Sequence, residues 1–281
     1  MTGPAFPQLQ VAQGTHPGRR RRLNEDAVVA SFPCFLVADG MGGHDRGERA
    51  SAIVVEELGA LAGRVDLGVE EVRDSLAQAR RRIAQVAGRD QRHAPGTTVS
   101  GIVLVVLEGE PYWLVVNLGD SRTYRLSRGR LEQISVDHSE VQELLDGGRI
   151  DDDQARNYFR RHVVTRVLGA GIVEQPDYWL LPPEPEERWL ICSDGLTGEL
   201  PDQHLMAVLS DQPTPQGAVD VLLAAALEAG ARDNVSLIVV DACQPSAADD
   251  LAPTVEEIAA AGAAGEVDDD TVPMPVTGRA P

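Results

Sequence analysis

The sequence contains no lysine, and all 25 of its Lys and Arg residues are arginines. A phosphate-binding P-loop, a Schiff-base enzyme and a protein kinase each depend on a specific lysine side chain. The composition therefore excludes these three classes of protein.

Cysteine is also scarce. The three cysteines, Cys34, Cys192 and Cys243, lie in or beside apolar runs and form no C-x-x-C pair. A nucleophilic thiol needs a nearby cation or a helix N-terminus to lower its pKa, whereas Cys192 is followed closely by the carboxylate of Asp194. Cysteine-based phosphate chemistry is therefore excluded, and the unpaired thiols predict a reducing, cytoplasmic location.

Long apolar segments and an excess of positive charge are both missing. No uncharged run is long enough to cross a membrane, and the N-terminus has no secretory signal. The net charge of -19 would repel a nucleic-acid backbone. We therefore expect neither a membrane nor a nucleic acid as a partner.

The 281 residues, 43% of them hydrophobic, are enough for one sizeable core. Short runs rich in Val, Ile and Leu predict strands, and apolar residues spaced three and four apart predict helices. Strands follow one another in pairs, as do helices, which favours an antiparallel α+β fold over a doubly wound parallel sheet. The strands are expected at 34–38, 99–107, 112–118, 188–192 and 235–240, and the helices at 48–61, 69–86 and 218–229.

The composition changes after Cys243. Residues 244–281 combine Ala, Gly and Pro with many acidic residues and a single arginine, Arg279. Such a segment cannot bury enough apolar surface to offset the entropy lost on ordering. We therefore expect one folded domain over residues 1–243 and a disordered acidic tail over residues 244–281.

Acidic residues recur where predicted strands end or begin, in several cases beside a glycine. If neighbouring strands bring these ends to one rim, several carboxylates converge, and such a cluster requires divalent cations to neutralise it. The acidic residues at these positions are Glu25, Asp26, Asp39, Asp120, Asp194 and Asp233.

The types of ligand select the metal. Carboxylates, backbone carbonyls and water suit Mg²⁺ or Mn²⁺, whereas zinc or copper would require His and Cys. A glycine after the acid, such as Gly40 after Asp39, lets its carbonyl approach the ion. Two such ions about 3.5 to 4 Å apart activate a shared water and clamp a phosphoryl oxygen. One arginine of the run over residues 19–22 can then bind the phosphate of a substrate, and the others are expected to form a solvated face.

A series of segments resembles, in family order, the bacterial metal-dependent serine/threonine protein phosphatases of type 2C, the PPM family. They are RRRRLNED, VADGMGGH, GTTVSGIVL, LGDSRTYRL, VDHSEVQELLDGG, TRVLG, CSDGLT and ARDNVSLIVV, over about residues 8–242. The resemblance implies an αββα four-layer sandwich, in which two antiparallel β-sheets are flanked by helix pairs. It identifies residues 1–243 as a catalytic domain.

The resemblance further implies an activity and its partners. Phosphoserine and phosphothreonine on proteins would be hydrolysed directly by a hydroxide that bridges two Mn²⁺ or Mg²⁺ ions per chain, with a third ion in some members. The substrates would be phosphorylated proteins, and the enzyme would oppose a bacterial serine/threonine kinase.

Individual roles follow from the same resemblance. The resemblance implies that one ion is bound by Glu25, Asp39 and the carbonyl of Gly40. It implies that the other ion is bound by Asp39, Asp194 and Asp233, so that Asp39 bridges the two ions. The remaining expected roles are phosphate binding for Arg21, a third metal for Asp120, and support of the ligands for Asp26 and Asn234.

The sequence departs from the family pattern in three places. Met41 stands where some relatives have a histidine proposed as general acid, and Gly198 where many have an acid that supports the third metal. In the flap segment, Asn157 and Tyr158 replace the His-Pro that is usual among bacterial members. The general acid and the occupancy of the third metal site therefore stay open.

Two other functions compete with this interpretation. A catalytically inactive member of the fold, serving as a regulatory binding module, should have lost Asp39, Asp194 or Asp233, and all three are present. An enzyme for one particular phosphorylated signalling protein is disfavoured because no sensor domain is visible.

A hydrolytic triad made of Asp137, His138 and Ser139 is also excluded, because adjacent residues of one loop cannot point at one another. Asp137 or Ser139 is instead expected to cap a helix, and His138 to cap or bridge loops.

Overall fold

The computed structural model describes residues 6–42, 46–87, 94–156, 158–160, 163–170 and 175–243. The chain divides into two units, residues 1–245 and 246–281, and every described residue belongs to the first. The predicted tail therefore lies outside the described residues. Within the described ranges, no helix is both long and apolar enough to cross a membrane.

The first of two β-sheets has five strands in the order β1-β12-β11-β7-β8. All of its neighbouring strands are antiparallel, and β12 pairs with β1 on one side and with β11 on the other. The strands are β1 (Gln8–His16), β7 (Arg122–Ser127), β8 (Arg130–Gln133), β11 (Glu187–Cys192) and β12 (Val235–Cys243).

The second sheet has seven strands in the order β10-β6-β5-β3-β4-β9, with β2 paired to β3 beside this path. These pairs are antiparallel as well. The strands are β2 (Asp26–Ser31), β3 (Cys34–Met41), β4 (Gly96–Thr97), β5 (Val99–Leu107), β6 (Glu110–Leu118), β9 (Leu168–Gly169) and β10 (Asp177–Leu181).

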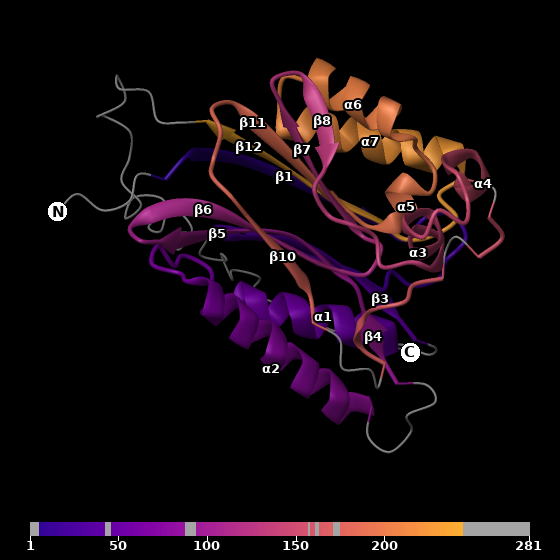
Figure 1. The fold of residues 1–281 in the computed structure, drawn as a ribbon, viewed down its shortest axis with the longest axis horizontal. Helices are drawn as coiled ribbons and strands as arrows, with labels where there is room; N and C mark the ends of the chain where they lie inside the picture. The colour runs from indigo at the N-terminus through magenta and orange to yellow at the C-terminus, as the bar shows by residue number, and fades with distance from the viewer. Residues whose placement is uncertain are drawn as a thin grey trace, which may run out of the picture. The chain divides into compact units, whose positions relative to one another are not determined.

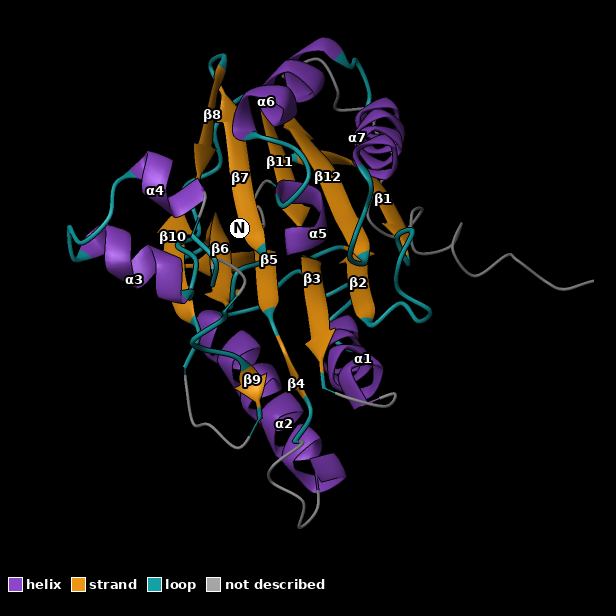
Figure 2. Ribbon diagram, turned by 90° about the vertical axis from the view of Figure 1, so that its right-hand side faces the viewer, coloured by secondary structure: helices purple, strands orange, loops and turns teal. Residues whose placement is uncertain are grey.

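Helices cover the outer face of each sheet (Figures 1 and 2). The helices α1 and α2 pack on the second sheet, and α6 and α7 pack on the first. The predicted four-layer αββα sandwich is therefore confirmed. The helices are α1 (Arg46–Gly59), α2 (Val69–Ala87), α3 (Glu140–Asp146), α4 (Asp152–Arg156), α5 (Asp194–Thr197), α6 (Asp202–Asp211) and α7 (Pro215–Ala229).

Both faces of the central strands are buried. In β3, Leu36 packs in the core under α1 and α2, whereas its neighbours Phe35 and Val37 pack between the two sheets. The layer between the sheets also holds Trp113 and Trp189, whose ring centroids are 5.9 Å apart. Because each of these strands has apolar neighbours on both sides, its sequence is a continuous apolar run instead of an alternating one.

A buried carboxyl group lies in the layer between the sheets. Glu187, at the start of β11, is 1% exposed, and its Oε1 accepts a hydrogen bond from Trp113 Nε1 at 2.5 Å. Burial raises the pKa of the Glu187 carboxyl above its ordinary value. The folded chain therefore holds this proton more tightly than the unfolded chain does.

We expect a Glu187→Gln variant to gain stability relative to the native chain as the pH rises. The contribution of Glu187 is fully present below the pKa of the unfolded chain and is lost as the pH rises through the higher folded pKa. Glutamine stays neutral and keeps an acceptor oxygen for Trp113, so it lacks this loss. Urea unfolding at pH 5 and pH 8 should show the stability difference changing by on the order of 1 kcal/mol. An identical difference at both pH values would contradict the prediction.

Candidate functional site

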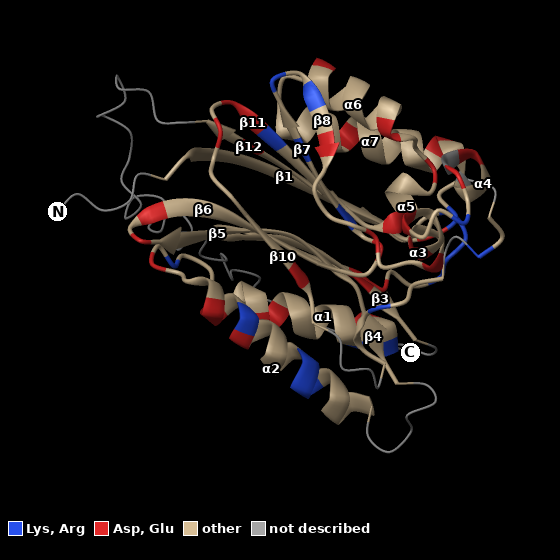
Figure 3. Cartoon of the chain, viewed as in Figure 1, with Lys and Arg blue, Asp and Glu red and all other residues tan. Residues whose placement is uncertain are grey.

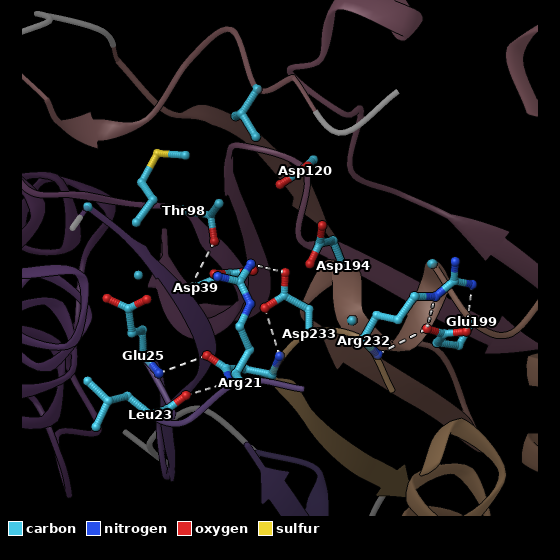
Figure 4. Close-up of a pocket in the computed structure, with 17 residues that line it drawn as sticks. Arg21, Leu23, Glu25, Asp39, Thr98, Asp120, Asp194, Glu199, Arg232 and Asp233 are labelled. Carbon is cyan, nitrogen blue, oxygen red and sulfur yellow. Dashed lines mark hydrogen bonds and ion pairs between the residues drawn. The ribbon is translucent and has the colours of Figure 1, made fainter. Parts of the chain in front are cut away.

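The acids predicted from the sequence meet at one cavity, of about 690 Å³, at an end of the two sheets (Figure 4). The second sheet contributes the residue before β2, a residue near the end of β3 and the turn after β6. The first sheet contributes the start of α5, directly after β11, and the residues before β12. The predicted residues that line the cavity are Arg21, Glu25, Asp39, Gly40, Asp120, Asp194, Asp233 and Asn234.

The backbone of Asp39 is fixed by two threonines. The Asp39 N–H donates to Thr98 Oγ1 at 3.0 Å, and the Asp39 carbonyl accepts from Thr98 N and Thr97 Oγ1, each at 2.9 Å. The hydroxyls of Thr98 and Ser121 lie 2.7 Å apart, which connects this position to the turn that carries Asp120. No role for these hydroxyl groups was predicted from the sequence, although both threonines lie in the segment GTTVSGIVL.

Gly40 is confined by its neighbours. A Cβ atom at this position would lie 2.3 Å from the Gly47 carbonyl oxygen and 2.5 Å from that of Glu25. The Gly40 N–H also donates to the Glu25 carbonyl at 3.2 Å. The packing of β3 against α1 and against the segment before β2 therefore requires glycine here, a reason different from the predicted access of its carbonyl to an ion.

Asn234 holds the segment that carries Arg21 and Glu25. Its Oδ1 accepts from the Glu25 N–H at 2.8 Å, and its Nδ2 donates to the carbonyls of Pro17 and Leu23 at 3.0 and 2.9 Å. Since Asp233 is the preceding residue, this side chain fixes the arginine segment next to an acid of the cavity.

Asp26 lies behind the cavity and is not among its lining residues. It is opposite Asp39 in the pairing of β2 with β3, and its Oδ2 accepts from Ser193 Oγ at 2.9 Å. Its Oδ1 is buried and has no hydrogen-bond partner within the described residues. Burial, together with the charges of Asp194 and Asp233, raises the pKa of Asp26 to about 7.

The cluster is electrostatically unfavourable without a cation. Burial raises the pKa values of Asp39 and Asp120 well above the ordinary range, and neighbouring carboxylates raise them further. The donors are carboxylate oxygens, which Mg²⁺ and Mn²⁺ prefer. The residues present therefore fit divalent cations of this kind.

The acidic side chains of the cavity are not arranged around one common point. In the part of the chain that the structure describes, no group of three or more His, Cys, Asp or Glu side chains is arranged to hold one ion. Instead, Arg21 Nη2 lies 2.6 Å from Asp233 Oδ2, and both side chains are partly exposed. An ion bound by Asp233 Oδ2 would therefore replace this contact with Arg21.

Asp137, His138 and Ser139 point to three different partners, so they form no triad. Arg122 donates to the Asp137 carboxylate through Nε and Nη2. His138 Nδ1 accepts from the Gly119 N–H at 3.1 Å and so holds the turn before Asp120, which agrees with the predicted bridging of loops. Ser139 Oγ accepts from Gln142 N and caps α3.

The structure describes three of the four residues at which the sequence departs from the family pattern. Met41 and Gly198 both line the cavity, and the Gly198 N–H donates to the Asp194 carbonyl at 2.6 Å. Tyr158 donates through its hydroxyl to Glu140 Oε1 at 2.9 Å. Asn157 lies outside the described residues.

Comparison with known proteins gives a consistent set of similarities. Residues 13–213 match the family model described as protein phosphatase 2C. The chain is 33% identical to the serine/threonine protein phosphatase PstP of Mycobacterium tuberculosis, over 97% of this chain and 51% of PstP. It is 30% identical to the serine/threonine phosphatase stp of Listeria monocytogenes, over 81% of this chain and 93% of that protein. The chain thus spans about half the length of PstP.

A solved structure matches the fold as well. The catalytic domain of PstP, determined in complex with two manganese ions, superimposes with a TM-score of 0.76 at 31% identity. The match covers 84% of this chain and 98% of that domain.

Proposed function

The chain belongs to the protein phosphatase 2C family, and we propose that it is a metal-dependent phosphatase for phosphoserine and phosphothreonine on proteins. The observation that supports this function best is the convergence of acids from both sheets on one cavity with an arginine at its edge. Burial and neighbouring carboxylates raise the pKa values of Asp39 and Asp120, and a bound cation would offset this repulsion.

We assign the metal ligands by combining this geometry with the family pattern. Glu25, Asp39 and the Gly40 carbonyl would hold one Mn²⁺ or Mg²⁺ ion, and Asp39, Asp194 and Asp233 would hold a second. Asp120 would contribute to a third site, which is weaker because Gly198 lines the same cavity without a carboxylate. When bound, the ions activate the attacking water and neutralise charge on the phosphoryl group.

The remaining residues bind and orient. Arg21, whose side chain is 52% exposed at the cavity edge, binds the phosphate oxygens of the substrate. Asn234 keeps Arg21 and Glu25 in register with Asp233 through its three hydrogen bonds. Asp26 supports Asp39 from the adjacent strand.

The wider setting follows from the proposed activity. Residues 1–243 form the catalytic domain, and residues 244–281 are a tail outside it. The substrates are phosphorylated proteins, and the enzyme opposes a serine/threonine kinase. Cys34 and Cys192 are buried free thiols, which supports a reducing, cytoplasmic location.

Release of phosphate from a phosphothreonine peptide tests this function. We expect turnover with Mn²⁺, loss of turnover in excess chelator, and recovery when Mn²⁺ is restored. Turnover that persists in chelator would contradict the metal-dependent mechanism. Failure to release phosphate with either Mn²⁺ or Mg²⁺ would instead support a regulatory binding module.

A further inference from the structure

An ion pair between exposed Arg232 and buried Glu199 lies on the rim of the cavity beside Asp233. Arg232 directly precedes Asp233, and Glu199 follows the short helix α5 that carries Asp194. Both residues line the cavity. In Figure 4 the pair lies on the side of the cavity opposite Leu23 and Glu25.

The two partners differ in exposure. Glu199 Oε1 accepts from the backbone N–H and from Nε of Arg232, each at 3.1 Å, and Oε2 accepts from Nη2 at 3.3 Å. The Glu199 side chain is 7% exposed, whereas that of Arg232 is 64% exposed. Within the described residues, Nη1 of Arg232 makes no hydrogen bond. The pair therefore buries its carboxylate and presents a guanidinium with unused donors to solvent.

The arginine run brings a second cation to the same place. The Arg19 N–H donates to the Ala231 carbonyl at 2.8 Å, and a Cβ atom at Gly18 would lie 2.1 Å from the Asp233 carbonyl oxygen. The segment before Arg20 thus packs closely against the loop that carries Arg232. Hydrogen bonds from Arg232 lower the pKa of Glu199 most, and the charge of Arg20 lowers it further.

Charge at this rim contrasts with the charge of the cavity. Arg232 pairs with the single buried carboxylate of Glu199, and Arg20 adds a second positive charge near it, so the rim carries an excess positive charge next to a strongly acidic interior. Both acidic and basic segments occur at the end of the sandwich near α5 (Figure 3). A chain of net charge -19 otherwise repels acidic peptides.

We propose that Arg232 and Arg20 form a subsite for an acidic side chain close to the phosphorylated residue of the substrate. The proposal rests on the phosphatase function proposed above and adds a substrate class, phosphopeptides with a neighbouring Asp or Glu. Because Arg232 is adjacent to Asp233, and consecutive Cα atoms are about 3.8 Å apart, the acidic residue lies within about two positions of the phosphorylated one.

Paired peptides and an unrelated small substrate test the subsite. Pairs of phosphothreonine peptides carry either Glu or Gln at one of four positions, the two before and the two after the phosphothreonine, and their kcat/KM values are compared. The small substrate p-nitrophenyl phosphate, which has no flanking residue, serves as the reference. The native chain should prefer Glu over Gln at one or more positions. Arg232→Gln and Arg20→Gln should each reduce that preference about threefold to fivefold. Activity on p-nitrophenyl phosphate should stay unchanged.

Two further variants sharpen the test. Glu199→Gln keeps acceptor capacity for the Arg232 N–H but removes the shared negative charge, so it should increase the preference for Glu. Arg22→Gln changes the same charge at an exposed position of the same run and should leave the preference unaltered.

The possible results distinguish a failure of the proposed subsite from a failure of the proposed phosphatase function. Equal losses on Glu peptides, Gln peptides and p-nitrophenyl phosphate would mean that the pair only braces the loop, and would overturn the subsite. An unchanged preference in Arg232→Gln and Arg20→Gln would overturn it as well. A native chain without activity on any of these substrates would overturn the proposed function, and the subsite with it.

Discussion

An Asp194→Asn variant should lose about a thousandfold or more of the native phosphatase activity. Asp194 begins α5 at the cavity and is assigned to the second metal ion. Bound ions of this kind contribute several kcal/mol to the transition state, and each 1.4 kcal/mol corresponds to about tenfold in rate. The measurement is phosphate release from a phosphothreonine peptide at saturating Mn²⁺.

The loss should occur without unfolding. The charge of Asp194 raises the pKa values of Asp26, Asp39 and Asp120, so its removal relieves repulsion in the metal-free chain. The melting temperature of metal-free Asp194→Asn should therefore be no lower than that of the native chain. Asp220→Asn, the same change on the exposed face of α7, is the matched control and should keep full activity. Substantial activity in Asp194→Asn would remove this residue from the metal site.

Replacement of Arg21 should weaken substrate binding more than it affects the metals. Hydrogen bonds to a charged group contribute about 1.5 to 3 kcal/mol, so Arg21→Gln should raise KM for a phosphopeptide by about tenfold to a hundredfold. Arg21→Lys should restore part of the loss, because a lysine keeps the charge but not the two-pronged geometry. Steady-state kinetics over a range of peptide concentrations measures both effects, with Arg22→Gln as the control.

The ion pair between Arg21 and Asp233 adds a second expectation for the same variant. Mn²⁺ must compete with this guanidinium for the Asp233 carboxylate, whose side chain is 38% exposed. An exposed pair contributes at most about 1 kcal/mol, so Arg21→Gln should tighten Mn²⁺ binding by no more than about fivefold. A higher Mn²⁺ affinity with an unchanged KM would show that Arg21 only neutralises Asp233.

The apolar runs predicted the central strands because these strands are buried on both faces. The expected strands at 34–38, 99–107 and 235–240 correspond to β3, β5 and β12, and the expected helix at 69–86 corresponds to α2. By contrast, β7 was not predicted, because its sequence RTYRLS contains two arginines. The structure explains this arginine-containing strand through partners that no local pattern reveals, such as Asp137 for Arg122.

The acids of the cavity could be predicted because each lies near a strand boundary and two of them, Asp39 and Asp194, are followed by glycine. The residues that position these acids could not be predicted from the sequence. Thr98 and Ser193 act through single hydroxyl groups, which are common in any strand or turn. Glu199 and Arg232 are 33 residues apart, and their pairing depends on the antiparallel contact of β11 with β12. Tertiary pairing of this kind leaves no periodic signal in the sequence.

The number of Mn²⁺ ions bound per chain tests whether the acids of the cavity form a two-metal site. Calorimetric titration of the metal-free native chain, with metal analysis after dialysis, gives both the number and the affinity. We predict two ions bound tightly to each native chain, and fewer in Asp39→Asn, which removes the proposed bridging carboxylate. A native chain that releases phosphate while binding no ion, or an Asp39→Asn variant that binds two ions as tightly as the native chain, would contradict this prediction.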